Sequence, residues 1–521
     1  MSMFKKSPEI ASSGDEKYEA LLDTILYRVP GTDTDIKWAD CVQGTLITGA
    51  TGSGKSSGPG KYIAYAMLKS GFGFCILCGK PDERKRWERY AQETGRSDDI
   101  VILDKKSDYK FNFLEYEMRR HGDGAGEVLN AINALMNLNE QNRVHQSGGE
   151  GREEKFWDNS LRRLISRTIQ LLRIAGEEVS IPNMRDIVST CFQGDDPKIY
   201  AEIKSIILSP EQIEPARRKQ AQTDLEIWKK DSYFLRLLEK INSGQVNNSF
   251  SKDEIRQVMN YWKREFPRIS ERTTSIIVES FMGIVEPFIG TGILRDHFSH
   301  GLSEELLPEN IITNNKIVII DFNVKEFELA GIYASTIYKS VFQSALERRE
   351  VTKEPFPPKL SVLWVDEYQL FCNPLRDSLF QSTARSSWVA TVYITQNLPG
   401  LYFSMGHSMP EARAKALLGN LNTKYFCSSD EPDTNEWASN MIGEHIAGLD
   451  TINIAEGETV TKTITQQIQR KILPSFFTEL RTGRKENNFI VEAVVFKAGK
   501  MWRSKKDEEE ENYAIVDFKQ K

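Results

Sequence analysis

The stretch GATGSGKS, at residues 49–56, decides the predicted fold of this chain. An apolar run at residues 44–48 comes directly before it, and a helix-like stretch at residues 60–70 follows. Strand, glycine turn and helix in this order are the context in which the pattern GxxxxGK[ST] binds phosphate. The sequence therefore predicts a P-loop and a bound nucleoside triphosphate, with a chance glycine turn of the same composition as the alternative.

The spacing of the P-loop residues follows from phosphate chemistry. Glycines let backbone N–H groups turn inward around phosphates, Lys55 reaches the β and γ oxygens, and the hydroxyl of Ser56 completes a magnesium shell. ATP and Mg²⁺ are the expected cofactors. The predicted nucleotide-binding residues are Gly49, Thr51, Gly52, Ser53, Gly54, Lys55, Ser56 and Ser57.

Two acidic residues follow a second apolar run. Residues 360–365 read as a strand, and Asp366 and Glu367 come directly after it. In P-loop enzymes the first acid after such a strand holds magnesium, and an adjacent glutamate can orient and deprotonate the attacking water. We predict that Asp366 is a metal residue and Glu367 a catalytic base; an acidic pair that merely ends a strand is the alternative.

Two further residues are candidates for catalysis, together with Lys55 and Glu367. Gln396 ends the apolar run at residues 389–394, where a polar side chain in RecA-like folds touches the γ-phosphate; a helix cap or turn residue is the alternative. Arg385 lies at the end of a helix-like stretch before that run. It is placed to reach a neighbouring subunit's γ-phosphate in an oligomer, unless it is a surface arginine.

The order of apolar runs predicts an α/β fold. Strand-like runs at residues 72–78 and 99–104 alternate with helical stretches, as in βα units that build a parallel sheet. From about residue 115 to 310 amphipathic helical patterns replace the strands, and a strand signal returns at residues 316–321. We predict an N-terminal arm over 1–40, a nucleotide-binding domain in two parts over 41–114 and 311–502, an all-α insertion over 115–310 and an acidic tail over 503–521.

Composition is that of a soluble cytoplasmic protein. The chain has 521 residues, so two or three domains are expected, and its net charge of −6 argues against a uniformly basic surface. Its six cysteines are scattered, which fits free thiols in a reducing compartment. We find no apolar window long enough to cross a membrane and no signal peptide.

The order of motifs resembles the TraG/TraD-like coupling proteins of type IV secretion, within the FtsK/HerA class of hexameric motors. The P-loop is followed by GKPDE at residues 79–83 and FNFL at residues 111–114, which look like that family's K(G/P)E and NPL segments. VDEY at residues 365–368, with Arg385 and Gln396, has family-like spacing. The resemblance extends over roughly residues 40 to 500, through similar segments at residues 275–295, 418–443, 473–480 and 488–496.

This resemblance implies a RecA-like domain with a mainly parallel sheet, interrupted by an all-α domain that meets a relaxase–DNA substrate. It also implies ATP-driven movement of single- or double-stranded DNA through a homo-hexameric pore. Members usually carry N-terminal transmembrane helices, which this sequence lacks, so we expect a membrane-anchored or secretion-channel partner protein at the inner membrane. Two other interpretations stay open: a HerA-like DNA-processing or defence ATPase with a nuclease or effector partner, and a nucleotide-gated scaffold that recruits substrates.

Overall fold

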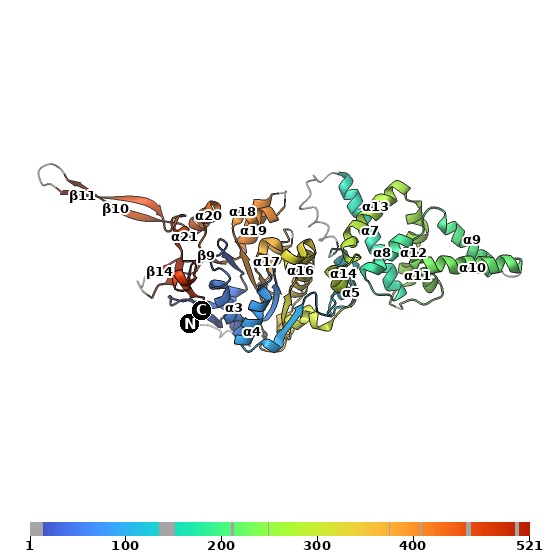
Figure 1. The fold of residues 1–521 in the computed structure, drawn as a ribbon, viewed down its shortest axis with the longest axis horizontal. Helices are drawn as coiled ribbons and strands as arrows, with labels where there is room; N and C mark the ends of the chain where they lie inside the picture. Colours follow the sequence, from blue (N-terminus) through green and yellow to red (C-terminus); the bar gives the residue numbers. More distant parts are fainter. Residues whose placement is uncertain are drawn as a thin grey trace, which may run out of the picture. The chain divides into compact units, whose positions relative to one another are not determined.

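The computed structural model describes residues 14–133, 135, 152–209, 213–247, 249–374, 376–406, 409–454, 460–505 and 510–520. The chain divides into two compact units (Figure 1). Unit 1 comprises Met1–Asp104, Leu307–Glu328 and Phe342–Lys521, and unit 2 comprises Lys105–Leu306 and Leu329–Val341.

Unit 1 is built on a nine-stranded sheet with the order β15-β12-β9-β3-β8-β7-β4-β6-β5. All neighbouring strands from β9 to β5 are parallel, and β12 and β15 are antiparallel to their neighbours. The predicted α/β fold with a mainly parallel sheet is confirmed. The strands are β3 (Thr45–Thr48), β4 (Gly73–Leu77), β5 (Ile100–Leu103), β6 (Ile317–Ile320), β7 (Ser361–Val365), β8 (Val389–Thr395), β9 (Thr423–Cys427), β12 (Ile490–Lys497) and β15 (Tyr513–Lys519).

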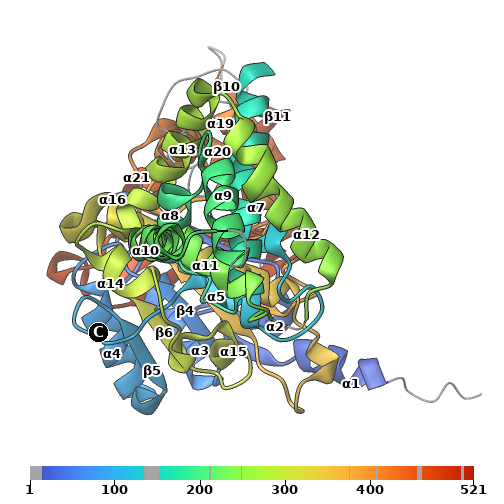
Figure 2. The ribbon, with the colours of Figure 1, turned by 90° about the vertical axis from the view of Figure 1, so that its right-hand side faces the viewer.

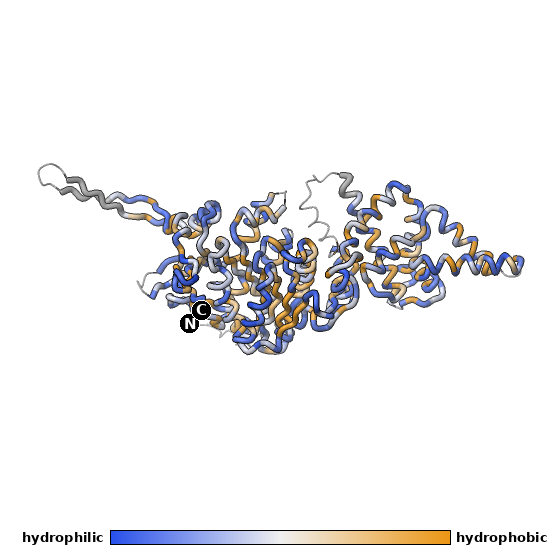
Figure 3. Tube along the Cα trace, in the orientation of Figure 1, coloured by the Kyte–Doolittle hydropathy of each residue, from blue (hydrophilic) through white to orange (hydrophobic). Residues whose placement is uncertain are grey.

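The sequence of the central strands explains their place in the sheet. β3, β4, β6, β7, β8 and β9 are buried along their whole length. A strand covered on both faces needs a continuous apolar run instead of an alternating one, and these runs provide it. The strands accordingly form the most hydrophobic part of unit 1 in Figure 3.

Helices and short ribbons surround this sheet. Three pairs of strands form two-stranded ribbons of their own among the described residues: β1 (Ile25–Arg28) with β2 (Asp35–Lys37), β10 (Glu444–Ile454) with β11 (Val460–Arg470), and β13 (Trp502–Arg503) with β14 (Glu510–Glu511). The helices are α1 (Gly14–Leu22), α2 (Trp38–Cys41), α3 (Pro59–Lys69), α4 (Glu83–Glu93), α15 (Pro308–Ile312), α17 (Asp377–Thr383), α18 (Leu398–Ser404), α19 (Pro410–Gly419), α20 (Pro432–Ile442) and α21 (Phe476–Glu479).

The prediction of an acidic tail over residues 503–521 is wrong for its last part. Residues 513–519 form β15, which pairs with β12 along seven positions, from Ile490 opposite Lys519 to Phe496 opposite Tyr513. Buried and exposed residues alternate in β15, and Val516 and Phe518 point into the core. The acidic run hides this period-two pattern because it comes directly before the strand. Residues 506–509 of that run lie outside the described residues.

The prediction of a separate N-terminal arm over residues 1–40 also needs correction. Residues 1–13 lie outside the described residues, but α1, β1, β2 and the start of α2 are part of unit 1. Val29, Ile36 and Trp38 are buried in its main hydrophobic core. Charged residues such as Arg28, Asp35 and Lys37 interrupt the apolar residues here, so the segment shows no long apolar run.

Unit 2 is helical, and Figure 2 shows its helix α10 nearly end-on beside α9 and α11. Helix α7 gives it a core through one stripe of residues, Leu161, Leu164, Ile165, Ile169 and Leu172, which are all buried as their helical spacing predicts. The helices are α5 (Phe113–Arg119), α7 (Arg152–Ala175), α8 (Ile181–Thr190), α9 (Asp196–Leu208), α10 (Pro215–Asp231), α11 (Tyr233–Asn242), α12 (Lys252–Asn260), α13 (Glu271–Val285) and α14 (Ile293–Phe298).

The boundaries of unit 2 differ from the predicted insertion at residues 115–310. Its first part begins at Lys105, because Phe111 packs against Phe298 and Phe113 packs against Phe288. Helix α16 (Val324–Glu347) contributes residues 329–341 to unit 2 and its two ends to unit 1. In the described part of the chain, no helix combines the length and the apolar character that a membrane crossing requires.

Candidate active site

The phosphate loop, residues 49–58, joins the carboxyl end of β3 to the start of α3. Gly52 at φ 82° and Gly54 at φ 84° have the left-handed backbone that L side chains rarely adopt. At Gly54 a Cβ would also collide with a methyl group of Val491 and lie 3.2 Å from the carbonyl oxygen of Thr482. The loop therefore requires glycine at these positions, both for its turns and for its close packing.

Two polar side chains in the loop are left available for a ligand. Lys55 is 5% exposed, and among the described residues the hydrogen bond of its Nζ is a long one of 3.5 Å to the carbonyl oxygen of Ala50. Burial lowers the pKa of Lys55, and the carboxylates of Glu367 and Asp366 oppose that shift. The hydroxyl of Ser53 is buried with no hydrogen-bond partner in the described part of the chain. Phosphate oxygens would satisfy both groups.

The two predicted metal residues lie in contact. Asp366 follows β7, which is separated from β3 in the sheet by β8, and the Ser56 hydroxyl donates a hydrogen bond of 2.8 Å to Asp366 Oδ2. A hydroxyl and a carboxylate are hard oxygen ligands, and Mg²⁺ is usually held by one or two such groups with water and substrate phosphates. The described residues contain no cluster of three or more His, Cys, Asp and Glu side chains suited to a metal. The donor set therefore fits Mg²⁺ bound together with a nucleotide.

Glu367 is held by three side chains. It is 3% exposed and has a left-handed backbone at φ 54°. Lys80 forms an ion pair with its Oε1, while Gln369 and Gln396 donate hydrogen bonds of 2.6 and 3.0 Å to its Oε2. Burial alone would raise the pKa of Glu367, but the hydrogen bond and charge of Lys80 lead the contacts that lower the pKa overall. The carboxyl group is therefore ionised at neutral pH, which is the form that a general base needs.

Gln396 connects the phosphate loop to Glu367. Its backbone carbonyl accepts a hydrogen bond of 3.3 Å from the amide of Gly49, and its side chain donates to Glu367. The residue comes directly after β8, the strand that lies between β3 and β7. A displacement of Gln396 would consequently act on the loop and on the carboxylate together.

Arg385 lies away from these groups. It is exposed in the turn between α17 and β8, and no hydrogen bond or ion pair of its side chain occurs among the described residues. Arg385 precedes β8, which has seven residues, and Gln396 follows it. At about 3.3 Å per residue this strand separates the two positions by roughly 20 Å. The structure does not bring Arg385 to the site of its own chain.

Three charged residues after β4 surround the site and were not assigned a role from the sequence. Besides Lys80, these are Glu83, whose carboxylate accepts from the backbone amide of Lys80 at 3.0 Å, and Arg86, whose Nη1 lies 3.6 Å from Asp366 Oδ2. Burial, followed by the negative charge of Asp366, raises the pKa of Glu83 well above its usual range. The signal was a charged GKPDE segment directly after a buried strand. This segment could be assigned to the site only once β4 was known to lie beside β7 in the sheet.

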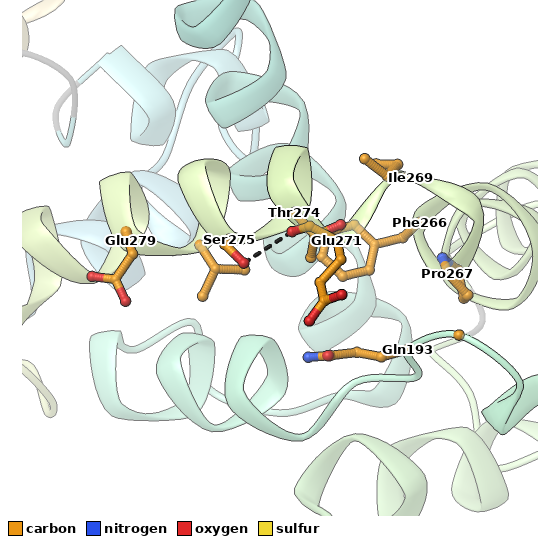
Figure 4. A pocket seen from close by; sticks show the side chains of 10 residues that line it. Gln193, Phe266, Pro267, Ile269, Glu271, Thr274, Ser275 and Glu279 are labelled. Carbon is orange, nitrogen blue, oxygen red and sulfur yellow. Dashed lines mark hydrogen bonds between the residues drawn. The ribbon is translucent and has the colours of Figure 1, made fainter.

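Unit 2 contains hollows of different chemical character. One of about 530 Å³ lies beside α13 and is lined by Gln193, Phe266, Glu271, Thr274 and Glu279 among others (Figure 4). It offers no cation to a phosphate. A second hollow of about 600 Å³ is lined by Arg167, Arg256, Gln257, Met259, Asn260, Lys263, Arg264 and Glu265, so that four of its eight residues are cations.

Residues 361–475 match the family described as the TraM recognition site of TraD and TraG. In this segment the chain is similar to the TraD and TraG coupling proteins. The matched segment contains Asp366, Glu367, Arg385 and Gln396, and the resemblance inferred from the sequence motifs is confirmed. No curated protein sequence matches the chain.

Solved structures of coupling proteins have a fold similar to that of this chain. The bacterial conjugative coupling protein TrwBdeltaN70, in an unbound form, is 14% identical, with a TM-score of 0.59 and coverage of 98% of this chain and 92% of that one. The plasmid coupling protein TrwB in complex with ADP and Mg²⁺ is 14% identical, with a TM-score of 0.57 and coverage of 97% and 92%. TrwB in complex with the non-hydrolysable ATP analogue ADPNP is 15% identical, with a TM-score of 0.57 and coverage of 100% and 96%. The predicted RecA-like fold is thereby confirmed.

Proposed function

We propose that this chain is an ATP-hydrolysing motor of the coupling-protein type, which recruits and moves DNA or a relaxase–DNA complex in conjugation or type IV secretion. The observation that carries the proposal is the convergence of Lys55, Ser56, Asp366 and Glu367 where β3 and β7 end. In open α/β sheets, ligands bind at the carboxyl ends of the strands. Glu367 is a carboxylate that can activate water, and it lies next to Ser56 and Asp366, the residues that fit Mg²⁺. An enzyme that hydrolyses its nucleotide needs this combination.

Each residue has a separate role in this proposal. Lys55 and the amides of the phosphate loop hold the β- and γ-phosphates, and Ser56 and Asp366 hold Mg²⁺, which neutralises the charge on the phosphates. Glu367 accepts the proton of the attacking water, and Gln396 responds to the loss of the γ-phosphate. Arg385 of a neighbouring subunit contacts the γ-phosphate, so the active unit is an oligomer, which we propose to be a hexamer.

Two features support binding partners: the segment that resembles the TraM recognition site, and a cationic hollow in unit 2. The segment that resembles the TraM recognition site supports a protein partner, which we propose to anchor the chain at the inner membrane. The hollow lined by Arg167, Arg256, Lys263 and Arg264 supports contact with nucleic-acid phosphates. In that hollow Arg256 is paired with Asp253, and Lys263, which is half-buried, forms no ion pair among the described residues. Burial lowers the pKa of Lys263, and a phosphate would compensate for that loss of hydration.

ATP hydrolysis measured with and without DNA tests the proposed function. We expect the steady-state rate of phosphate release to rise when DNA is added. We also expect DNA binding to weaken steeply as salt is increased, because each phosphate contact releases condensed counterions. An ATPase rate that is indifferent to DNA and to ionic strength would contradict the proposal. A protein that turns over ATP only with a co-purified nuclease or other effector would favour the HerA-like alternative.

Replacing Lys80 by methionine is expected to move the acid limb of the pH–rate profile to higher pH. The charge of Lys80 lowers the pKa of Glu367, so its removal raises that pKa and protonates the base at a higher pH. The measurement is kcat as a function of pH, and Lys80→Arg, which keeps the charge, is the control. An acid limb at the same pH in all three proteins would show that Lys80 does not set the ionisation of the base.

A further inference from the structure

The last described residues of the chain, which end at Gln520, lie against the phosphate loop. β15 pairs with β12 so that its end lies at the beginning of β12, and the backbone amide of Gln520 donates to the carbonyl oxygen of Phe489 at 2.9 Å. The Gln520 side-chain amide nitrogen donates to the hydroxyl of Ser57 at 2.8 Å. Lys61 Nζ, in the first turns of α3, donates to the backbone carbonyl of Gln520 at 3.0 Å. The C-terminal end is therefore connected to both the loop and the helix that follows it.

The same glutamine also holds a second segment, residues 482–491, in place beside the loop. Gln520 Oε1 accepts a hydrogen bond of 2.8 Å from the backbone amide of Arg484. Arg484 has φ 63°, a left-handed conformation that is strained for a residue with a side chain. The amide of Phe489 donates to the carbonyl oxygen of Arg484 at 2.7 Å, which closes the turn. Both polar atoms of the Gln520 side-chain amide thus form hydrogen bonds, the nitrogen with Ser57 in the loop and the oxygen with Arg484.

This backbone conformation directs the Arg484 side chain to the phosphate loop. Its Nη2 lies 3.1 Å from the position that a Cβ would take on Gly52. The side chain is exposed, and the described residues provide it with no hydrogen bond or ion pair. A guanidinium has five N–H donors in a planar fork that matches phosphate oxygens. The nearby hydroxyl of Ser53 is buried and also without a partner, so two unused donors lie at one loop.

We propose that Arg484 binds the phosphate chain of the nucleotide held by the loop of its own subunit, and that Gln520 is the positioning residue that fixes Arg484 and Ser57. The assignment rests on the proposed nucleotide site. It gives the loop a second cation besides Lys55, supplied by the segment before β12. It also gives a role to Gln520, since removal of its side chain would release Arg484 and Ser57 together.

Nucleotide binding by the full-length chain, measured with fluorescent ADP and a non-hydrolysable fluorescent ATP analogue, tests this assignment. Arg484→Gln is expected to weaken both affinities on the order of 10- to 100-fold, the usual effect of losing a hydrogen bond to a charged group. Arg484→Lys should restore part of the affinity, and Gln520→Ala should weaken it less than Arg484→Gln does. The control is Lys485→Gln, which removes a neighbouring exposed charge and should bind as the wild type does.

Thermal unfolding without nucleotide separates a binding role from a structural one. The Tm of nucleotide-free Arg484→Gln should equal that of the wild type, and the increase in Tm on adding nucleotide should be smaller. Unchanged nucleotide affinity in Arg484→Gln and Gln520→Ala would overturn the assignment while the proposed function stands. A wild-type chain that binds no nucleotide would instead overturn the proposed function. A loss of affinity that occurs only in assembled oligomers would place Arg484 on a neighbour's nucleotide and overturn the assignment in cis.

Discussion

Glu367→Gln is expected to lower the rate of ATP hydrolysis by about 10²- to 10⁴-fold and to leave ATP binding intact, because it removes the general base and little else. The variant keeps the size of the side chain and the acceptor that faces Lys80. It places an amide nitrogen where Oε2 accepted hydrogen bonds from Gln369 and Gln396, so those two side chains must turn to keep a partner. ATP should therefore remain bound and unhydrolysed.

Phosphate release in a single turnover, together with the amount of ATP retained on the protein, measures this effect. Glu411→Gln is a matched control, because Glu411 is exposed and forms an ion pair with Lys415 on the same helix. A surface pair of this kind contributes little, so the control should behave as the wild type does. If substrate recruitment by Glu367→Gln were unaltered, the nucleotide would act as a switch for a scaffold that recruits substrates.

Arg385→Ala is expected to reduce ATP hydrolysis by about 10³- to 10⁵-fold, the range of arginine fingers supplied by a neighbouring molecule. The structure predicts that Arg385 acts on the nucleotide of a neighbouring subunit. Arg385 precedes β8 while Gln396 follows it, so the arginine cannot reach the phosphate loop of its own chain. Its loss should leave nucleotide binding by an isolated subunit unchanged. Arg385→Lys should recover only part of the rate, because lysine lacks the planar fork.

Mixing two inactive variants tests whether Arg385 acts between subunits. Lys55→Ala lacks the phosphate contact and Arg385→Ala lacks the finger, so each alone is inactive. In mixed oligomers some junctions combine an intact Lys55 with an intact Arg385, and activity should return. Full activity of Arg385→Ala alone would identify Arg385 as an ordinary surface residue, and a mixture that stays inactive would exclude a role in trans.

The sequence predicted those parts of the site whose signal is local. The P-loop and the acidic pair Asp366 and Glu367 are short patterns next to apolar runs, and the structure brings them together at one edge of the sheet. Lys80 and Arg86 also follow a recognisable strand. Their role depends on β4 lying beside β7, and strand order is a long-range property that local patterns do not contain.

β15 and the positions of Arg484 and Gln520 were the least predictable part of unit 1. β15 has a period-two pattern, but it follows an acidic run, and charge dominated the interpretation of that segment. Arg484 and Gln520 are single polar residues separated by 36 positions. Their position at the phosphate loop follows from the antiparallel pairing of β12 with β15, which no spacing in the sequence indicates.

An image of Glu367→Gln particles with ATP, Mg²⁺ and DNA would show whether the protein is a ring-shaped DNA motor. The variant should hold ATP without hydrolysis and so trap one state of the motor. We expect six copies around a DNA strand, with each nucleotide between Lys55 of one subunit and Arg385 of the next. Single copies with bound ATP, or rings in which DNA never enters the centre, would contradict it.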